Sequence, residues 1–265
     1  MKENDFVKKT LDFSKKLNIN LIKKFVVFDE VISTNDIAKQ RAINGEDEGT
    51  VVISRIQKKG RGRFDRIWES PDGGMYLSII LRPKGTPEKA MLLSLMTAIV
   101  ISKTMSSYNL SPKIKWPNDI RVSGKKIAGV LIESEAYQNK LKYIVIGIGI
   151  NLNINLQNLS EKIRSSSTSL LKEVGSFVDY YNFLSNLLKN LDKYYMIFLT
   201  KNFKYIIQEW KNHSDTIGQK VIINSSNEPI EGKVIEINPS GFLEVILDTG
   251  KIRIISSGEF IYLED

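Results

Sequence analysis

Residues 57–68, with the sequence QKKGRGRFDRIW, combine residue types that could bind an anion. Two glycines alternate with arginines in the GRGR segment, residues 60–63, so the backbone can turn tightly while several guanidinium groups converge on one ligand. The charged side chains outnumber the apolar ones, and the segment therefore cannot form a face of the core. We predict a basic loop that closes on a phosphate or a carboxylate. A solvated basic loop, or an Arg-Gly arm that binds nucleic acid, is the alternative interpretation.

Two polar motifs elsewhere could supply hydrogen bonds to such a ligand. Ser33, Thr34 and Asn35 stand at the expected start of a helix, where free backbone N–H groups also point outward. Simple capping of that helix is the alternative, and it accounts for one of the three side chains. Residues 115–119, KWPND, form a compact polar turn with an aromatic floor. An ordinary turn with Trp116 in the core would have the same sequence.

Residues 125–133, KKIAGVLIE, alternate in the manner of a strand that carries a cation into an apolar setting. In a regular strand Lys126 and Ala128 share one face, and Gly129 lies on the other face as a place for close approach. A lysine is costly to bury unless it meets an anion. We therefore expect Lys126 to face a bound anion.

Residues 147–151, GIGIN, place two glycines at positions i and i+2 of an expected strand. One face of that strand is therefore bare and leaves a slot for a flat ring, with Asn151 at its end. The motif is a poor dinucleotide fingerprint, because no G-x-x-G continuation into a helix follows. Close packing of the bare strand against a helix is the alternative.

The composition of the 265 residues limits the chemistry further. The absence of cysteine excludes a thiolate nucleophile, a disulfide and a zinc–thiolate site, and the single histidine, His213, is expected to be a surface or packing residue. A hydrophobic content of 42% supports a substantial core. Arginines and a lysine can neutralise a carboxylate and a triphosphate that would otherwise repel each other, so electrostatics and proximity can supply the catalysis. The motifs point to activation of a carboxylate by ATP.

Charge and hydropathy bear on the compartment and the partners. No apolar run is expected to reach the length of a membrane span, and residues 1–24 contain no stretch of the signal-peptide type. We therefore expect a cytoplasmic protein that does not bind a membrane. The net charge of +8 could indicate nucleic acid or an acidic protein partner, but the lysines are spread along the chain in the way of a solvated surface.

Periodicity and turn residues predict alternating helices and strands followed by a β-rich end. Helices are expected within residues 1–23 and over 33–43, 87–108 and 177–200, with a last one that ends near Trp210. Strands are expected over 24–28, 50–57, 75–81, 113–116, 120–122, 126–133, 143–150, 220–224, 230–238, 243–247 and 251–255. Residues 156–170 are expected to be a loop. The short C-terminal strands predict a small barrel.

Taken in order, these motifs resemble those of the biotin–protein ligase family, the biotin–[acetyl-CoA-carboxylase] ligases, over residues 25–265. The resemblance implies an α+β fold, in which a mixed sheet packs against helices as in class II aminoacyl-tRNA synthetases and biotin ligases. It also implies a small C-terminal SH3-like β-barrel. We expect an N-terminal helical extension over residues 1–23, a catalytic domain over 24–213 and the SH3-like domain over 214–265.

The resemblance implies a reaction in two steps. Biotin and ATP, with Mg²⁺, give biotinyl-5′-AMP and pyrophosphate, and the biotinyl group then passes to one lysine of a biotin carboxyl carrier protein. No dedicated metal site is expected in the protein itself. The identity of the carrier, the role of the C-terminal domain, and the choice between monomer and homodimer stay open.

Roles follow from the resemblance position by position. Ser33, Thr34 and Gln57 are expected to hydrogen-bond the ureido ring, Lys126 to neutralise charge on the carboxylate and phosphate, and Arg66 to face the pyrophosphate. Arg61, Arg63 and Lys126 are the expected catalytic residues. The expected biotin-binding residues are Ser33, Thr34, Asn35, Gln57, Gly60, Arg61, Gly62, Arg63, Trp68, Lys126, Gly129, Gly147 and Gly149. The expected ATP-binding residues are Arg61, Arg63, Arg66, Asn118, Asp119, Lys126 and Asn151.

Two departures from the family pattern matter. The family loop often carries glycine where this chain has Asp65, and aspartate tolerates the left-handed backbone better than most residues, so the loop fold should survive. Some members also carry an N-terminal winged helix-turn-helix, which the residues before 24 are too few to supply. We expect a ligase without repressor activity and without specific DNA binding.

Two rival functions deserve comparison. A lipoate- or octanoate-handling relative would share the catalytic architecture, but its cysteine-dependent branch is excluded by composition and its lipoate ligase branch lacks this GRGR loop. A basic nucleic-acid-binding module would explain the +8 charge and the Arg-Gly loop. Such a module needs aromatic stacking platforms beside the basic residues, and the aromatics here are not clustered with the loop.

Overall fold

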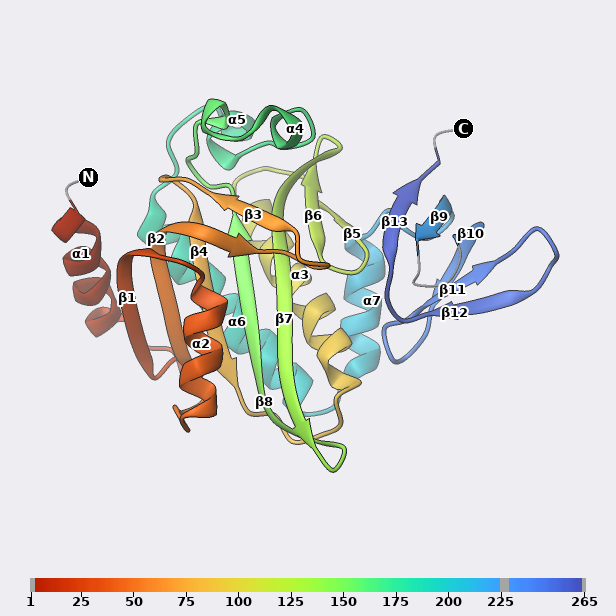
Figure 1. Cartoon of the computed structure of the whole chain (residues 1–265), viewed down its shortest axis with the longest axis horizontal. Coiled ribbons are helices and arrows are strands. Elements are labelled where there is room, and N and C mark those ends of the chain that lie inside the picture. Colours follow the sequence, from red (N-terminus) through yellow and green to blue (C-terminus); the bar gives the residue numbers. More distant parts are fainter. Residues whose placement is uncertain (1–2, 225–228, 264–265) are drawn as a thin grey trace.

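A computed structural model describes residues 3–224 and 229–263 of the chain. A larger part is built on an eight-stranded mixed sheet with helices on both faces, and a smaller C-terminal part is a five-stranded antiparallel sheet (Figure 1). The α+β fold with a small C-terminal β domain is therefore confirmed. The boundaries proposed between its parts, at residues 23/24 and 213/214, stay a prediction.

The large sheet has the strand order β1-β2-β4-β8-β7-β6-β5, with β3 paired to β2. Only β1 and β2 run parallel; the other pairs in this sheet are antiparallel. The central strand β4 is buried along its whole length, as its continuous apolar run requires. The bounds are β1 Lys24–Val31, β2 Thr50–Arg61, β3 Ile67–Ser70, β4 Met75–Leu81, β5 Lys113–Lys115, β6 Asp119–Val122, β7 Lys125–Tyr137 and β8 Lys140–Ile150.

Helices cover the two faces of this sheet unequally. Helix α3 (Lys89–Ser106), α6 (Tyr180–Leu199) and α7 (Phe203–His213) pack together on one face, over the main hydrophobic core. On the other face α2 (Thr34–Ile43) closes a small second core with side chains such as Ile80 of β4. Helix α1 (Glu3–Lys16) lies beside β1 (Figure 1). The site-bearing residues at the start of α2 thus lie directly over the sheet.

Helix α3 differs from the expectation that no apolar run reaches the length of a membrane span. It spans 18 residues with a mean hydropathy of 1.2, which is long and apolar enough to cross a membrane by length and composition alone. In the fold, 72% of that helix is buried. Its apolar character is that of a core helix between the sheet and helices α6 and α7.

The small sheet has the order β12-β11-β10-β9-β13. Its strands are β9 Lys220–Asn224, β10 Ile230–Ile237, β11 Leu243–Ile246, β12 Ile252–Ile255 and β13 Glu259–Tyr262. The sequence Asn227-Glu228-Pro229 also predicts a turn between the first two of these strands, and this turn lies largely outside the described residues. Strand β13 was not predicted, because four residues that follow a Ser-Ser-Gly sequence carry too short a pattern. This strand matters, since it lies against the large domain.

The expected loop at residues 156–170 is partly wrong. It contains a 3-10 turn (Leu156–Asn158) and the one-turn helix α4 (Glu161–Arg164), and helix α5 (Leu170–Val174) begins at its end. Elements of four or five residues hold together through contacts with the rest of the chain and not through their own periodicity. Here the backbone of Ser166 and Thr168 hydrogen-bonds to both sides of Lys126 on β7.

Candidate active site

A cavity of about 430 Å³ lies where the GRGR loop, the ends of β7 and β8, and the small domain meet. Every residue predicted to contact biotin or ATP lines it, with the exception of Gly60. An added Cβ at Gly60 would lie 2.4 Å from the Trp68 carbonyl oxygen, so this glycine permits the close crossing of β2 and β3. Lining residues that the sequence did not predict include Glu69, Lys115, Arg121, Leu131, Ile148, Leu159, Ile163, Ser166, Ser167, Gly258 and Phe260.

One end of the cavity is a hydrogen-bonding cluster at the start of α2. The Thr34 backbone N–H and its hydroxyl both donate to Gln57 Oε1, at 2.8 and 3.1 Å. Gln57 Nε2 in turn donates to Ser70 Oγ at 2.9 Å. Ser33 occupies the N-cap position, as predicted, but its side chain does not cap the helix. Its buried hydroxyl has no hydrogen-bond partner among the described residues, and it is left for a ligand.

The glycines of β7 and β8 form the floor of the cavity. Gly129 and Gly149 are directly paired across the two strands. An added Cβ at Gly149 would lie 2.6 Å from the Trp68 indole, and one at Gly147 would lie 2.1 Å from Asn35 Oδ1. As GIGIN predicted, this face of β8 carries no side chains of its own at positions 147 and 149. The side chains of Trp68 and Asn35 pack directly against it.

The predicted orientation of Lys126 relative to Gly129 is wrong. A bulge in β7 against β6 gives Ile127 no partner, because Ile120 pairs with Ala128 and Arg121 pairs with Lys126. Lys126 consequently lies on the same face as Gly129, with its Nζ 3.6 Å from the position of an added Gly129 Cβ. A strict two-residue alternation cannot anticipate a bulge. The bulge brings the lysine and the glycine floor into one cavity.

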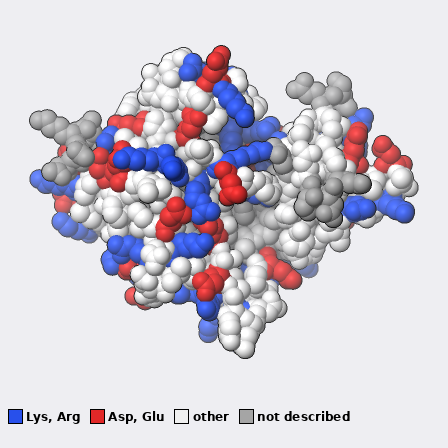
Figure 2. Space-filling model, viewed as in Figure 1, with Lys and Arg blue, Asp and Glu red and all other residues white. Residues whose placement is uncertain are grey.

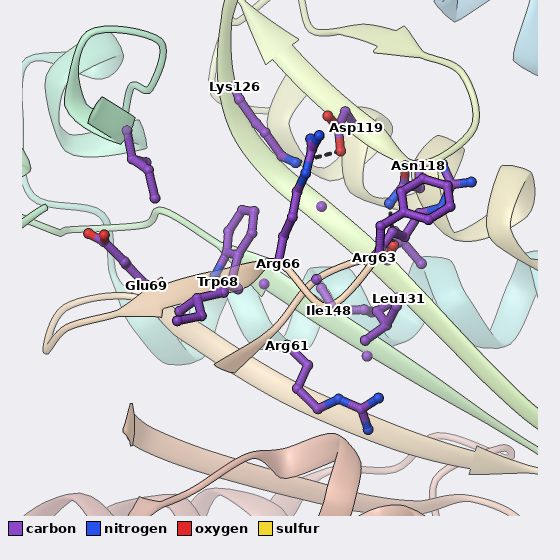
Figure 3. Close-up of a pocket in the computed structure, with 18 of the residues that line it drawn as sticks. Arg61, Arg63, Arg66, Trp68, Glu69, Asn118, Asp119, Lys126, Leu131 and Ile148 are labelled. Carbon is purple, nitrogen blue, oxygen red and sulfur yellow. Dashed lines mark hydrogen bonds and ion pairs between the residues drawn. The ribbon is translucent and has the colours of Figure 1, made fainter. Parts of the chain in front are cut away.

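The other end of the cavity is cationic. Lys126 Nζ forms an ion pair with Asp119 Oδ1 at 2.6 Å and lies 5.2 Å from the centre of the Trp68 ring. Figure 3 shows the Arg66 side chain extending toward this pair. Burial lowers the pKa of Arg63, an effect that nearby Asp119 partly opposes. Half-buried and exposed cations gathered around one carboxylate make a site suited to a polyanion.

Arg61 is directed differently from the other two arginines of the loop. Its Nη1 contacts Asp36 Oδ1 at 2.8 Å and both oxygens of Glu133 at 3.1 and 3.2 Å. The hydrogen bond to Asp36 is the main reason why the pKa of Arg61 is raised. In Figure 3 its guanidinium group points away from the Lys126–Asp119 pair. The three arginines do not converge on one point in this structure.

The loop between β2 and β3 is a tight turn. The Gly62 N–H donates to the Arg66 carbonyl at 2.7 Å, and Arg66 N–H donates to the Arg63 carbonyl at 3.2 Å. Phe64 and Asp65 adopt left-handed backbone conformations, with φ of 54° and 56°. The tolerance expected of Asp65 is therefore used in the structure.

The KWPND motif connects the cavity to the small domain. Trp116 is buried, and its Nε1 donates to the Gly241 carbonyl at 2.9 Å. Lys115 Nζ donates to the Phe260 carbonyl at 2.7 Å, and its burial is the main reason why its pKa is lowered to about 8. Asn118 Nδ2 donates to the Val130 carbonyl at 2.7 Å. The motif both lines the cavity and places Trp116 in the core, and its contact with a ligand stays a prediction.

Comparisons with known proteins agree with this geometry. Residues 27–151 match the biotin/lipoate A/B protein ligase family, and residues 216–262 match the biotin protein ligase C-terminal domain. The bifunctional ligase/repressor BirA of Bacillus spizizenii is 31% identical over 91% of this chain and 75% of its own length. The biotin–[acetyl-CoA-carboxylase] ligase of Paracoccus denitrificans is 28% identical over 80% of this chain and 89% of its own.

Solved structures give the same result. The biotin protein ligase from Aquifex aeolicus in complex with biotin and ATP superimposes with a TM-score of 0.77 and 29% identity, over 92% of this chain and 100% of that one. The family resemblance seen in the five motifs is thereby confirmed at the level of whole domains. This chain belongs to the biotin protein ligase family.

Proposed function

We propose that this protein is a biotin–protein ligase, which forms biotinyl-5′-AMP from biotin and ATP and transfers biotin to a lysine of a carrier protein. The observation that carries the proposal is the division of one cavity into two chemically distinct ends. The Ser33–Thr34–Gln57 end, with its glycine floor, suits a flat polar ring. The end with Lys126, Arg63 and Arg66 suits a carboxylate beside a triphosphate.

In the first step, a biotin carboxylate oxygen attacks the α-phosphorus of ATP. A new O–P bond forms while the bond to the bridging oxygen breaks, and pyrophosphate leaves. Lys126 reduces the repulsion between carboxylate and phosphate and holds them in line. Arg63 places a second positive charge beside the α-phosphate, and Arg66 stabilises the leaving pyrophosphate.

In the second step, the neutral ε-amine of the carrier lysine attacks the acyl carbon of biotinyl-AMP. The C–N bond forms, the anhydride C–O bond breaks, AMP leaves, and the amine loses a proton. Trp68 lies over Gly129 and Gly149, and we expect this side chain and the loop to cover biotinyl-AMP before the carrier arrives and to limit attack by water.

Mg²⁺ is proposed to enter with the nucleotide. The described portions of the chain contain no group of three or more His, Asp or Glu side chains that could hold a metal ion. Mg²⁺ commonly keeps several waters and binds through substrate phosphates with one or two carboxylates. Asp119, at the cationic end, is the carboxylate that we expect to contact it. The ion would offset negative charge on the phosphates.

Several wider expectations belong to the same proposal. The carrier is a biotin carboxyl carrier domain, the compartment is the cytoplasm, and the catalytic part ends near residue 213. Asn118 and Asn151 are proposed to act at the adenylate. Both amide groups also donate to backbone carbonyls, of Val130 and Thr168, and so hold the strand ends around the site.

Exchange of radiolabelled pyrophosphate into ATP tests the first step. The expected result is exchange that depends on added biotin, followed by labelling of an isolated carrier domain with biotin. Exchange that depends on lipoate or octanoate and not on biotin would place the protein in the rival branch of the fold. A lack of exchange with any of these acids would contradict acid activation altogether.

A further inference from the structure

Glu133 lies on β7 one step outside the cavity and is the meeting point of three elements. It follows Gly129 and Leu131, which line the cavity, on the same face of the strand. Its carboxylate accepts from Asn35 Nδ2 at 3.1 Å and from Arg61 Nη1 at 3.1 and 3.2 Å, and Lys39 Nζ lies 3.5 Å away. Its side chain is 15% exposed. One carboxylate therefore joins α2, the base of the GRGR loop and β7.

The contact with Asn35 fixes the direction of a chain of hydrogen bonds. A carboxylate only accepts, so the Asn35 amide must present its Nδ2 to Glu133 and its Oδ1 to Ser78. Ser78 Oγ shares its one proton between that oxygen, at 2.6 Å, and Thr34 Oγ1, at 2.8 Å. The Thr34 hydroxyl accepts from Ser78 and donates to Gln57, so its remaining lone pair is what it can offer to a ligand.

The contact with Arg61 holds the base of the loop. Asp36 and Glu133 together place two carboxylates on one guanidinium group. Arg61 is the last residue of β2, and the turn that carries Arg63 and Arg66 begins immediately after it. Fixing Arg61 therefore limits where the two following arginines can reach.

We propose that Glu133 is a positioning residue for biotin recognition, which orients Asn35 and the hydrogen-bond chain behind it and holds Arg61 at the base of the loop. This inference rests on the proposed function, because biotin is the ligand whose ring these hydrogen-bonding side chains would contact. An acceptor hydroxyl at Thr34 matches the N–H groups of a ureido ring. Glu133 touches no substrate and acts through Asn35 and Arg61.

The test is biotin binding by titration calorimetry, without nucleotide, on wild type and Glu133→Gln. The glutamine keeps the shape of the side chain but can present either a donor or an acceptor to Asn35, and it removes the charge opposite Arg61. We expect the Kd for biotin to rise about tenfold. The rate of adenylate formation at saturating biotin should change less than threefold, because Lys126, Arg63 and Arg66 are unaltered and Asp36 still holds Arg61 at the base of the loop.

Glu135→Gln is the matched control. Glu135 is two residues further along the same face of β7, and its carboxylate pairs with Lys142 Nζ at 2.9 Å, away from the cavity. We expect its Kd for biotin to stay within twofold of wild type. Asp36→Asn, which removes only the negative charge of the second carboxylate beside Arg61, should accelerate tryptic cleavage of the loop and raise the Kd less than Glu133→Gln does.

A double-mutant cycle with Asn35→Ala separates positioning from general destabilisation. If Glu133 acts through Asn35, the combined rise in Kd must be smaller than the product of the two single effects. A combined effect equal to the product would overturn the inference, as would equal Kd values for Glu133→Gln and Glu135→Gln. Should Glu133→Gln not fold, Glu133→Asp carries the same test, since it keeps the charge and loses the reach. Failure of the wild type to bind biotin would instead overturn the proposed function.

Discussion

Lys126 shows how one side chain can be prepared for an anion before the anion arrives. It emerges beside a bulge, reaches over the glycine floor and rests on Asp119 at 2.6 Å. In the free protein this ion pair offsets part of the free-energy cost of removing the ammonium group from water. A bound carboxylate and phosphate would compete with Asp119 for the same ammonium group, so binding exchanges one partner for others.

Replacement of Lys126 by glutamine is expected to slow adenylate formation by two to three orders of magnitude, because a lost charge-assisted contact in a dry site costs about 3–4 kcal/mol. Folding should change little, since the side chain is partly exposed. The measurement is biotin-dependent pyrophosphate exchange, with Lys125→Gln, outside the cavity lining, as the matched control. Exchange at the wild-type rate in Lys126→Gln would remove this lysine from the mechanism.

Lys115 leads to a pH-dependent prediction. Its burial, helped by the nearby charge of Arg121, lowers its pKa to about 8. The ammonium group is therefore charged below pH 8 and loses its proton as the pH rises through that value. Since Lys115 lines the cationic end, the KM for ATP should rise severalfold between about pH 7.5 and 9. In Lys115→Gln the KM should be higher at pH 7.5 and nearly flat, and an equal rise in both proteins would contradict the assignment.

The same shift has a consequence for stability. The pKa of Lys115 is lower in the folded chain than its ordinary value of 10.5, so the unfolded chain binds more protons between about pH 8 and 10.5. The contribution of Lys115 to the free energy of unfolding should therefore rise with pH across that window. Chemical denaturation of wild type and Lys115→Gln at several pH values would measure the difference.

At the residue scale, local sequence predicted which side chains line the cavity but not where each one points. Ser33, Thr34, Gln57 and Trp68 could be found because their motifs combine unusual residue types at short spacing. The partners of Arg61 could not be found, because Asp36 and Glu133 lie 25 and 72 residues away in the chain. Lys115 and Arg121 were missed as lining residues because their place depends on contact with β13.

Among the elements, the loop between β2 and β3 is where mobility is expected. It has little buried apolar surface to offset the entropy of ordering, and Phe64 and Ile67 are 59% and 65% exposed. Biotinyl-AMP would supply the anion around which Arg63 and Arg66 can gather. We therefore expect ligand binding to order residues 58–68.

Limited trypsin digestion provides the measurement, because the end of β2 and the loop after it contain Lys58, Lys59, Arg61, Arg63 and Arg66. Cleavage there should be fast in the free protein and suppressed at least tenfold by biotin plus MgATP. Digestion with ATP alone serves as the control and should give weaker protection. Equal cleavage rates with and without both ligands would mean that the loop is not a lid.

The helices and strands that the sequence did not predict are all short, although some equally short strands were predicted. A mostly apolar run located β4 at its observed bounds, and helix α3 was expected from its long apolar run. Helix α4 and strand β13 have four residues each and depend on distant backbone partners. The bulge at Ile127 is a register shift between two strands, so it has no signature in either strand alone.

On the scale of the whole molecule, the charge distribution argues for a protein that attracts polyanions weakly and without selectivity. The net charge is +8, yet Figure 2 shows Asp and Glu interspersed with Lys and Arg over the face in view. A scattered positive surface gives binding to DNA that depends on salt and not on sequence.

Binding to a duplex of arbitrary sequence should therefore weaken about tenfold or more between roughly 50 and 200 mM salt. Fluorescence anisotropy with two unrelated duplexes of equal length provides the measurement, and the two should give the same Kd at each salt concentration. A footprint on one particular sequence that persists at physiological salt would contradict this prediction.

The glycine floor constrains how this site can evolve. A substitution at Gly129, Gly147 or Gly149 can only add atoms, and an added Cβ at Gly149 would already collide with the Trp68 indole. Mutation of the strands can thus only narrow the space above them. Wider ligands become accessible through loss of bulk at Trp68 or Asn35, the side chains that now stand on the floor. Descendants with altered ligand range should first differ at positions 35 and 68, on α2 and β3, while strands β7 and β8 beneath stay the same.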